Sequence, residues 1–476
     1  MSSSDPSHRT IPIQAAPDDH SSGYLYASMP KIYPRTVHGV FARWRWVGVW
    51  LTQLVFYGLP WLEWGQRQAV LFDLQSRRFY LFGLVLYPQD FIYLTGLLVV
   101  SALSLFLFTA VAGRLWCGYA CPQTVYSEIF MWIERQIEGD RSARMRLDAG
   151  PLSLEKWVKK VYKHILWLGL ALWTGFTFVG YFTPIHDLGL AFLQTHMGSW
   201  EVFWVFFYGL ATYGNAGFMR EQVCKYMCPY ARFQSAMFDK DTLIVTYDER
   251  RGEPRGSRSR HVALKDTGLG ACVDCDLCVH VCPTGIDIRK GLQYECIGCA
   301  ACVDVCDGVM EKMGYDKGLI RYATQNALTH GWGVSQMWRR VFRPRVLIYT
   351  AILWLLIFGV VLSLVWRMPM KVDVIRDRGL PRITSEGKIE NVYRLQVMNA
   401  TEEQLTLQLK VTGLSGLEVS SDDDWMVGPA QSRWIAVRVD SPMDQTLAGS
   451  HPIWMEVYTP DGRLHVREKA VFLVPR

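Results

Sequence analysis

The sequence predicts a multidomain protein with three parts: a five-helix α membrane bundle, a small α+β module rich in cysteine, and an all-β C-terminal sandwich. Three observations lead to this prediction. Five apolar blocks are each close to the length that an α-helix needs to cross a membrane. All twelve cysteines fall in short-spaced groups between Cys117 and Cys306. Residues 369–476 alternate apolar and polar side chains and contain no cysteine.

Composition divides the chain into five parts. Residues 1–40 are polar, have no signal-peptide pattern, and are expected to be disordered and cytoplasmic. The remaining parts are a membrane domain with four spans (41–240), the cysteine-rich module (241–340), a fifth transmembrane helix (341–368) and the sandwich (369–476).

The five spans cover about residues 46–64, 91–112, 164–182, 200–219 and 346–366. Lys and Arg are concentrated in the loop between the second and third spans, whereas the loop between the third and fourth has neither. The positive-inside rule then places the cysteine-rich module in the cytoplasm and the sandwich outside. The net charge of +6 follows these loops rather than one basic stripe, so membrane lipid is the expected partner and nucleic acid is not.

Eight cysteines form two runs with C-x2-C-x2-C-x3-C spacing. In bacterial two-cluster ferredoxins each run gives three ligands to one cluster and its fourth cysteine to the other. The spacing therefore predicts a ferredoxin-like module with two [4Fe-4S] clusters. One would be held by Cys272, Cys275, Cys278 and Cys306, and the other by Cys296, Cys299, Cys302 and Cys282.

The alternative for these eight cysteines is a pair of structural zinc sites. Zinc sites usually show two separated C-x2-C pairs rather than two triads with a trailing fourth cysteine, so the iron–sulfur interpretation is favoured. Pro283 follows the first run, whereas Asp307 stands at the equivalent place in the second.

The other four cysteines form two copies of a C-x-x-x-C-P motif, each directly after a predicted span. The proline suits the first position of a new helix, whose positive end would favour thiolate at the preceding cysteine. If the two spans are neighbours, the four sulfurs form one catalytic or metal-binding group at the cytoplasmic membrane edge. Its members are Cys117, Cys121, Cys224 and Cys228.

Several roles remain open for this group. Soft thiolates can bind Cu(I), a further iron–sulfur centre, or form reversible disulfides, and inert buried cysteines are the plain alternative. Met131, His164, Met219 and Met227 are candidate accessory ligands, although packing is the more ordinary role for each. His186 and His196 are assigned no role.

The C-terminal region predicts an immunoglobulin-like sandwich. Its five clearest strands cover residues 391–399, 405–411, 433–439, 451–458 and 465–474. Nothing in this region resembles a catalytic constellation.

With these residues assembled, the chain resembles the CcoG/FixG/RdxA family of accessory proteins for cbb3-type cytochrome oxidase assembly in bacteria. The resemblance covers nearly the whole chain and includes the segments WCGYACP, CKYMCP and RGEPRG, the eight-cysteine run and the sandwich. It implies a cupric reductase of the bacterial inner membrane, with a periplasmic sandwich, that converts Cu(II) to Cu(I) for the oxidase. Copper ions, oxidase assembly factors and a copper-exporting ATPase are the implied partners.

The paired C-x-x-x-C-P motifs also look like those of the NapH and NosR membrane electron-transfer proteins. Two further hypotheses follow: a quinol-linked conduit to a partner outside the membrane, and a non-enzymatic assembly scaffold. The sequence has no flavin or dinucleotide glycine fingerprint in a suitable context, so the electron donor stays unnamed.

Overall fold

A computed structural model describes residues 31–260, 268–377, 379, 381–385, 387–420, 425–443 and 448–475. The chain forms two compact units. Unit 1 comprises Met1–Trp61 and Thr95–Ile357, and unit 2 comprises Leu62–Leu94 and Phe358–Arg476.

Each of the five predicted spans contains a helix, although the first ends early, because residues 63–64 form a strand instead. They correspond to α1 (Val40–Gly58), α2 (Phe91–Ala112), α6 (Leu154–Val179), α8 (Ser199–Thr212) with the π-helix η4 (Tyr213–Met219), and α16 (Pro344–Val365). Within the described residues, two helical stretches are long and apolar enough to cross a membrane, Pro88–Ala112 and Pro344–Val365. The five-helix membrane bundle therefore remains a prediction.

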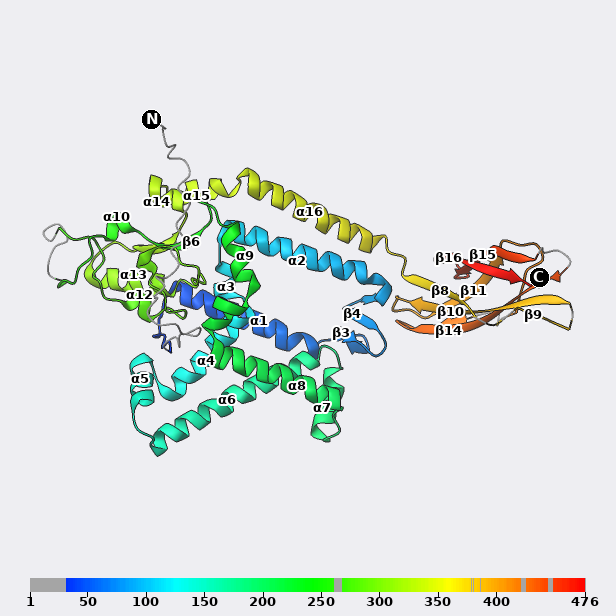
Figure 1. Ribbon diagram of the computed structural model, residues 1–476, viewed down its shortest axis with the longest axis horizontal. Helices are drawn as coiled ribbons and strands as arrows, with labels where there is room; N and C mark the ends of the chain where they lie inside the picture. The colour runs from blue at the N-terminus through cyan, green and yellow to red at the C-terminus, as the bar shows by residue number, and fades with distance from the viewer. Residues whose placement is uncertain are drawn as a thin grey trace, which may run out of the picture. The chain divides into compact units, whose positions relative to one another are not determined.

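Charge and length explain why α1, α6 and α8 are not among the helices that are long and apolar enough to cross a membrane. The first turns of α1 contain Arg43 and Arg45, and α6 begins with a charged segment. Helix α8 ends after 14 residues and passes into η4. Shorter helices connect these elements: α3 (Leu115–Tyr119), α4 (Pro122–Glu138), α5 (Arg141–Ala149), α7 (Ile185–Leu193), the π-helix η5 (Val223–Met227) and α9 (Pro229–Met237) (Figure 1).

The cysteine-rich module has a two-stranded antiparallel sheet and short helices. Strands β6 (Ile244–Tyr247) and β7 (Ile320–Ala323) pair with each other. The helices are α10 (Glu249–Gly252), α12 (Leu277–His280), η6 (Ile288–Lys290), α13 (Ala301–Met313), α14 (Gln325–His330) and α15 (Val334–Val341). Its core packs cysteines of both runs with Val245, Tyr247 and Met310.

Helix α1 is joined to this module at its N-terminus. The Asp304 carboxylate on α13 accepts hydrogen bonds from the backbone N–H groups of Phe41 (3.1 Å) and Ala42 (2.7 Å). These are groups that the helix itself leaves unpaired, so a carboxylate from another element caps α1.

The predicted disorder of residues 1–40 is wrong for the described part. Residues 1–30 lie outside the described residues, but residues 31–39 pack against the rest of unit 1. The Arg35 N–H donates to the His280 carbonyl at 2.8 Å, and the Thr36 hydroxyl donates to Asp140 at 2.8 Å. Polar composition alone did not reveal these partners.

Unit 2 contains the β-sandwich, and all five strands predicted from the sequence are present. One sheet has the order β12-β14-β10-β8, with β9 beside β10, and the other the order β13-β11-β15-β16. The strands are β8 (Met370–Arg376), β9 (Arg382–Ile383), β10 (Lys388–Asn399), β11 (Leu405–Thr412), β12 (Glu418–Ser420), β13 (Trp425–Val427), β14 (Ser432–Pro442), β15 (Gly449–Tyr458) and β16 (His465–Val474). Alternating apolar side chains from both sheets form its core.

The segment between helices α1 and α2 belongs to the same unit, which the sequence did not indicate. It contains β1 (Glu63–Trp64), β2 (Arg67–Gln68), β3 (Val70–Asp73), β4 (Arg78–Leu81) and β5 (Leu84–Leu86). Tyr87 donates a hydrogen bond to the Asn399 carbonyl at 2.9 Å, and Arg367 pairs with the buried Asp90 at 2.8 Å. The two segments share buried residues, so they fold as one body.

Candidate functional site

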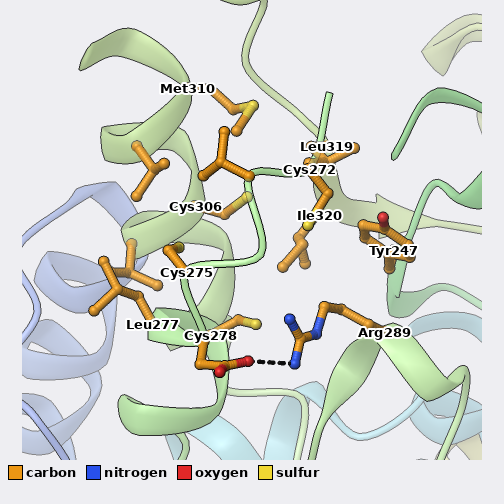
Figure 2. A pocket seen from close by; sticks show the side chains of 14 residues that line it. Tyr247, Cys272, Cys275, Leu277, Cys278, Arg289, Cys306, Met310, Leu319 and Ile320 are labelled. Atoms are coloured by element: carbon orange, nitrogen blue, oxygen red, sulfur yellow. Dashed lines mark hydrogen bonds and ion pairs between the residues drawn. The ribbon is translucent and has the colours of Figure 1, made fainter. Parts of the chain in front are cut away.

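Four cysteines surround one cavity in the cysteine-rich module, as Figure 2 shows. They are Cys272, Cys275 and Cys278, around the start of α12, and Cys306 from α13. Apolar side chains such as Leu319 and Ile320 form much of the remaining wall, and the cavity is small. Four thiols around a small apolar space form a donor set that fits a [4Fe-4S] cluster.

Arg289 is a residue that the motifs did not reveal. It lines the same cavity, and its guanidinium pairs with Asp274 (2.7 Å), Asp276 (2.6 Å) and Asp287 (2.8 Å). Asp274 and Asp276 flank Cys275, so Arg289 holds the cysteine loop in place. A basic residue soon after the first cysteine run was the only signal in the sequence.

A second cavity is lined by Cys282 and by Cys296, Cys299 and Cys302. The loops around the two cavities repeat one backbone conformation. Asp274 and Asp276 beside Cys275, and Gly298 and Ala300 beside Cys299, all have positive φ angles of 52–69°. This left-handed conformation is uncommon outside glycine, so its repeat at equivalent positions shows that both runs wrap in the same way. The second donor set therefore also fits a [4Fe-4S] cluster.

Asp307 has a structural explanation. It lies inside α13, which continues to Met313, whereas Pro283 lies beyond the end of α12 at His280. A proline at position 307 would remove a helical hydrogen bond and clash with the preceding turn. The Asp307 carboxylate instead accepts a hydrogen bond from the Gly318 N–H at 2.8 Å.

The two C-x-x-x-C-P motifs differ locally. Cys117 lies in the α-helical turn α3, whereas Cys224 lies in the π-helix η5. In both motifs the second cysteine is the N-cap of the next helix, with the proline at its first position. The prediction that each proline begins a helix is therefore confirmed.

Contacts across the chain bring the two motifs together. The Cys117 thiol and the Gln234 side chain on α9 form a hydrogen bond, with 3.4 Å between Sγ and Nε2. The Gln123 amide on α4 donates to the Asn215 (2.9 Å) and Arg220 (3.1 Å) carbonyls, which precede the second motif. Gln234 and Gln123 were not singled out from the sequence.

The first motif also contacts the loop that carries Cys296, Cys299 and Cys302, which we call the second cluster loop. A Cβ atom on Gly118 would lie 2.8 Å from the Cα atom of Cys299. Arg114, just before the motif, donates to the carbonyls of Cys296 (3.4 Å) and Ala231 (2.7 Å). One arginine thus joins the first motif, the second cluster loop and the helix after the second motif.

The predicted thiolate character of Cys121 is wrong for the free thiol. Burial raises the pKa of Cys117 to about 11 and that of Cys224 to about 12, and burial also raises the pKa of Cys121. Loss of hydration outweighs the positive helix end. Ionisation of Cys117, Cys121 or Cys228 would raise the pKa of Cys224 further, so the four thiols are electrostatically coupled.

A cavity with several charged side chains in its wall reaches this group from the side. Cys224 and Met131 form part of its lining, together with the charged side chains Arg45, Glu128, Arg220 and Glu221. Another part of the lining consists of Pro283, Thr284 and Ile297, which are neighbours of the second-cluster cysteines Cys282 and Cys296. One cavity therefore touches both Cys224 of the second C-x-x-x-C-P motif and the segments beside Cys282 and Cys296.

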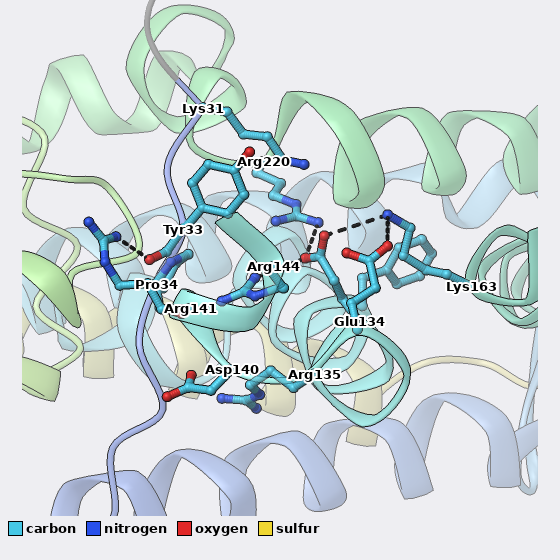
Figure 3. A network of polar contacts seen from close by, with 12 residues as sticks. Lys31, Tyr33, Pro34, Glu134, Arg135, Asp140, Arg141, Arg144, Lys163 and Arg220 are labelled. Carbon is cyan, nitrogen blue, oxygen red and sulfur yellow. Dashed lines mark hydrogen bonds and ion pairs between the residues drawn. The ribbon is translucent and has the colours of Figure 1, made fainter. Parts of the chain in front are cut away.

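A buried ionic network anchors the second motif (Figure 3). Glu134 on α4 is almost fully buried and pairs with Arg220 (2.9 Å), Arg144 (3.2 Å) and Lys163 (3.6 Å). Burial alone would raise the pKa of Glu134, but these three cations hold it below the usual range. Arg220 precedes the second motif, so the network fixes that motif to the helix that follows the first.

The other candidate ligands have ordinary contacts. Tyr213 and the His164 ring are hydrogen-bonded at 2.9 Å. Met227 is 56% exposed, and Met131 alone of the accessory candidates lines the cavity at Cys224. Within the described residues, no three His, Cys, Asp or Glu side chains lie close enough to hold a single metal ion.

Comparisons with known proteins agree with this architecture. Family models described as "4Fe-4S binding domain", "4Fe-4S dicluster domain" and "IG-like fold at C-terminal of FixG" match residues 94–138, 219–325 and 360–475. The first of these includes Cys117 and Cys121, and the second includes the other ten cysteines.

Three relatives are informative. The chain is 41% identical to nitrogen fixation protein FixG of Rhizobium meliloti, over 82% of this chain and 81% of FixG. It is also 41% identical to protein RdxA of Cereibacter sphaeroides, over 83% of this chain and 85% of RdxA. Ferredoxin-type protein NapH of Escherichia coli is 21% identical over 57% of this chain and 82% of NapH. These likenesses support an iron–sulfur protein of electron transfer.

Proposed function

Because the chain belongs to the FixG/RdxA family, we propose that it is a membrane oxidoreductase that reduces Cu(II) to Cu(I) for copper delivery in cbb3-type oxidase assembly. The reaction adds one electron to one copper ion. When bound, each [4Fe-4S] cluster supplies reversible one-electron chemistry. The residues that would hold the two clusters are Cys272, Cys275, Cys278 and Cys306, and Cys282, Cys296, Cys299 and Cys302.

The cavity at Cys224 carries the proposal. It joins one of the four membrane-edge thiols to the segment that holds the second cluster. The Glu128 and Glu221 carboxylates offer oxygen ligands to Cu(II), and sulfur offers softer ligands to Cu(I). The preference of thiolates for Cu(I) would favour the reduced product.

The four thiols are too far apart for three of them to bind one ion together as they stand. Copper would therefore draw them closer or bind to fewer of them. Copper binding would also displace protons, because burial keeps the thiols of Cys117, Cys121 and Cys224 protonated.

We further propose a bacterial inner-membrane location with the cysteine-rich module in the cytoplasm and the sandwich in the periplasm. Two apolar helices support a membrane location. Residues Leu62–Leu94 share one unit with the sandwich, which supports placing both on the same side. Oxidase assembly factors and a copper-exporting ATPase are the proposed partners.

A second candidate is an electron conduit to a periplasmic partner, favoured by the likeness to NapH over most of that protein. Two assays together distinguish the cupric reductase, the electron conduit and a scaffold role. The chain with both Cys121→Ser and Cys228→Ser is purified anaerobically beside the wild type, and Cu(II) reduction is followed by stopped flow.

Serine keeps the size and the helix starts, but hydroxyls are poor ligands for Cu(I). We expect Cu(II) reduction to collapse while iron content persists. Reduction at the wild-type rate with intact clusters would show that these thiols are not the copper site. Copper-independent electron transfer by the wild type in proteoliposomes would favour the conduit, and inactivity of the wild type in both assays would favour the scaffold.

A further inference from the structure

A large apolar cavity lies between α1, α4 and α6, apart from the cysteines. Its volume is about 630 Å³, and part of it is open to the outside. Three tryptophans, Trp46, Trp50 and Trp132, form much of its wall. Trp50 is 63% exposed, so a ligand can enter from the surface. Flat aromatic walls and this size suit a ring-containing lipophilic molecule.

Gln53 supplies an unsatisfied polar atom at this cavity. It lines the wall, and its Oε1 atom is buried without a hydrogen-bond partner among the described residues. A buried amide oxygen without a partner is destabilising, so a donor group is missing here.

Tyr57 lines the same cavity, and its hydrogen bonds have a defined direction. Thr174 donates its hydroxyl proton to the Leu170 carbonyl at 2.8 Å. Tyr57 must therefore be the donor in its 2.8 Å contact with Thr174. The Tyr57 oxygen in turn accepts from the Tyr126 hydroxyl at 3.5 Å. Gln53 is therefore the residue of this wall that calls for a ligand with a hydroxyl donor.

We propose that this cavity binds the head group of a lipophilic para-quinol, a ring with two hydroxyl donors. One hydroxyl donates to Gln53 Oε1, and the ring packs against the tryptophans. The oxidised quinone has carbonyls in place of hydroxyls, so it leaves Gln53 unpaired and binds more weakly. The site is thus selective for the reduced, electron-donating form.

The cavity adjoins the redox region through α1. On one side of this helix Val49 lines the cavity, and its neighbour Gly48 packs against the Tyr119 carbonyl, where a Cβ atom would come within 2.5 Å. Tyr119 lies inside the first C-x-x-x-C-P motif. The quinol ring would therefore be separated from this motif by about the width of one helix, roughly 10 Å.

This inference rests on the proposed function for the fate of the electrons. Oxidation of one quinol to its quinone breaks two O–H bonds and gives two protons to water. It supplies two electrons, the number that two one-electron iron–sulfur clusters accept together. Two Cu(II) ions would be reduced for each quinol consumed.

Binding is tested without copper, so that failure of this inference is distinguishable from failure of the reductase. Full-length protein in lipid nanodiscs is titrated by calorimetry with decylubiquinol, using reduced protein, and with decylubiquinone, using oxidised protein, so that no electron passes. We expect saturable binding in both cases, with the quinol bound about two- to tenfold more tightly, as expected for one hydrogen bond.

Three variants locate the site. Gln53→Leu should abolish the preference for quinol while quinone binding persists, and Trp50→Leu should weaken both ligands several-fold. Trp44→Leu is the matched control, because Trp44 is on the same helix, is 61% exposed and does not line the cavity. Non-saturable partitioning that is equal in all variants would assign the cavity to lipid chains and overturn the proposal, as would equal affinities for quinol and quinone in the wild type.

Discussion

Gly118 packs against the backbone of Cys299, so closely that a Cβ atom on residue 118 would lie 2.8 Å from the Cys299 Cα atom. One residue belongs to the first C-x-x-x-C-P motif and the other to the second cluster loop. Only hydrogen separates the two backbones at this point, and the cysteines of the first C-x-x-x-C-P motif are therefore direct neighbours of a candidate cluster site.

This contact predicts that Gly118→Ala disturbs the second cluster. The added methyl group meets backbone that has no room to give way, and such overpacking is destabilising by about 1–3 kcal/mol. We expect a lower melting temperature and an altered electron paramagnetic resonance signal of the reduced protein. Gly308→Ala is the control, because it adds a methyl group to α13 with no atom within 4 Å. Identical spectra for the two variants would contradict the close packing.

Asp307→Pro should disrupt the ligand loop of both clusters. Position 307 is inside α13, directly after Cys306, and a proline within a helix is destabilising by about 3 kcal/mol or more. We expect less iron and acid-labile sulfide per chain, whereas Asp307→Asn, which keeps the helix, should retain both. Full cluster content in Asp307→Pro would show that α13 does not need to continue past Cys306.

Anaerobically purified protein should contain about eight irons and eight acid-labile sulfides, with broad absorbance that bleaches on reduction. Cys278→Ser should damage the cluster shared with Cys306, because the two cysteines line one cavity. Chemical analysis of metal and sulfide checks both statements. A protein with about two zinc ions and no sulfide would refute the iron–sulfur assignment of the eight cysteines.

Glu134→Gln should destabilise unit 1 by about 3–5 kcal/mol, because it leaves three cations around a buried position without their shared carboxylate. The native pKa of Glu134 lies below its ordinary value of 4.5. The ionised Glu134 carboxylate therefore stabilises the fold fully above pH 4.5. This stabilisation is lost as the pH falls through the lower pKa of the folded protein.

Denaturant unfolding at several pH values measures the difference in unfolding free energy between the wild type and Glu134→Gln. This difference should become smaller in acid. Glu155→Gln is the control, since Glu155 pairs only with Lys159 at the surface and should not measurably change stability. Equal unfolding free energies for the two variants at neutral pH would show that the ionic network around Glu134 does not stabilise the position of the second motif.

Topology can be tested with reporter fusions. Segment Leu62–Leu94 and the sandwich fold as one unit, so reporters fused after Ser76 and after Asp373 should report the same side of the membrane. Both should be active as periplasmic reporters, and one fused within residues 248–260 should not be. The reverse pattern would place the cysteine-rich module outside and invert the proposed orientation.

The sequence alone determined the features that rest on local spacing. The two cysteine runs indicated which cysteines belong together, and the structure gathers Cys306 with the first run around one cavity. Strand alternation located β10, β11, β14, β15 and β16, and the prolines after Cys121 and Cys228 located two helix starts. Each of these features depends on neighbours within a few residues, which the sequence displays directly.

Tertiary structure decided what depends on distant partners. The cap of α1 by Asp304 joins residues 263 positions apart, and residues 31–39 are ordered by partners far along the chain. The contact of Gly118 with Cys299 and the gathering of three cations on Glu134 are equally non-local. The pKa values of the membrane-edge cysteines show the physical reason: a helix start is a local signal that favours thiolate, but burial by distant segments is stronger and reverses it.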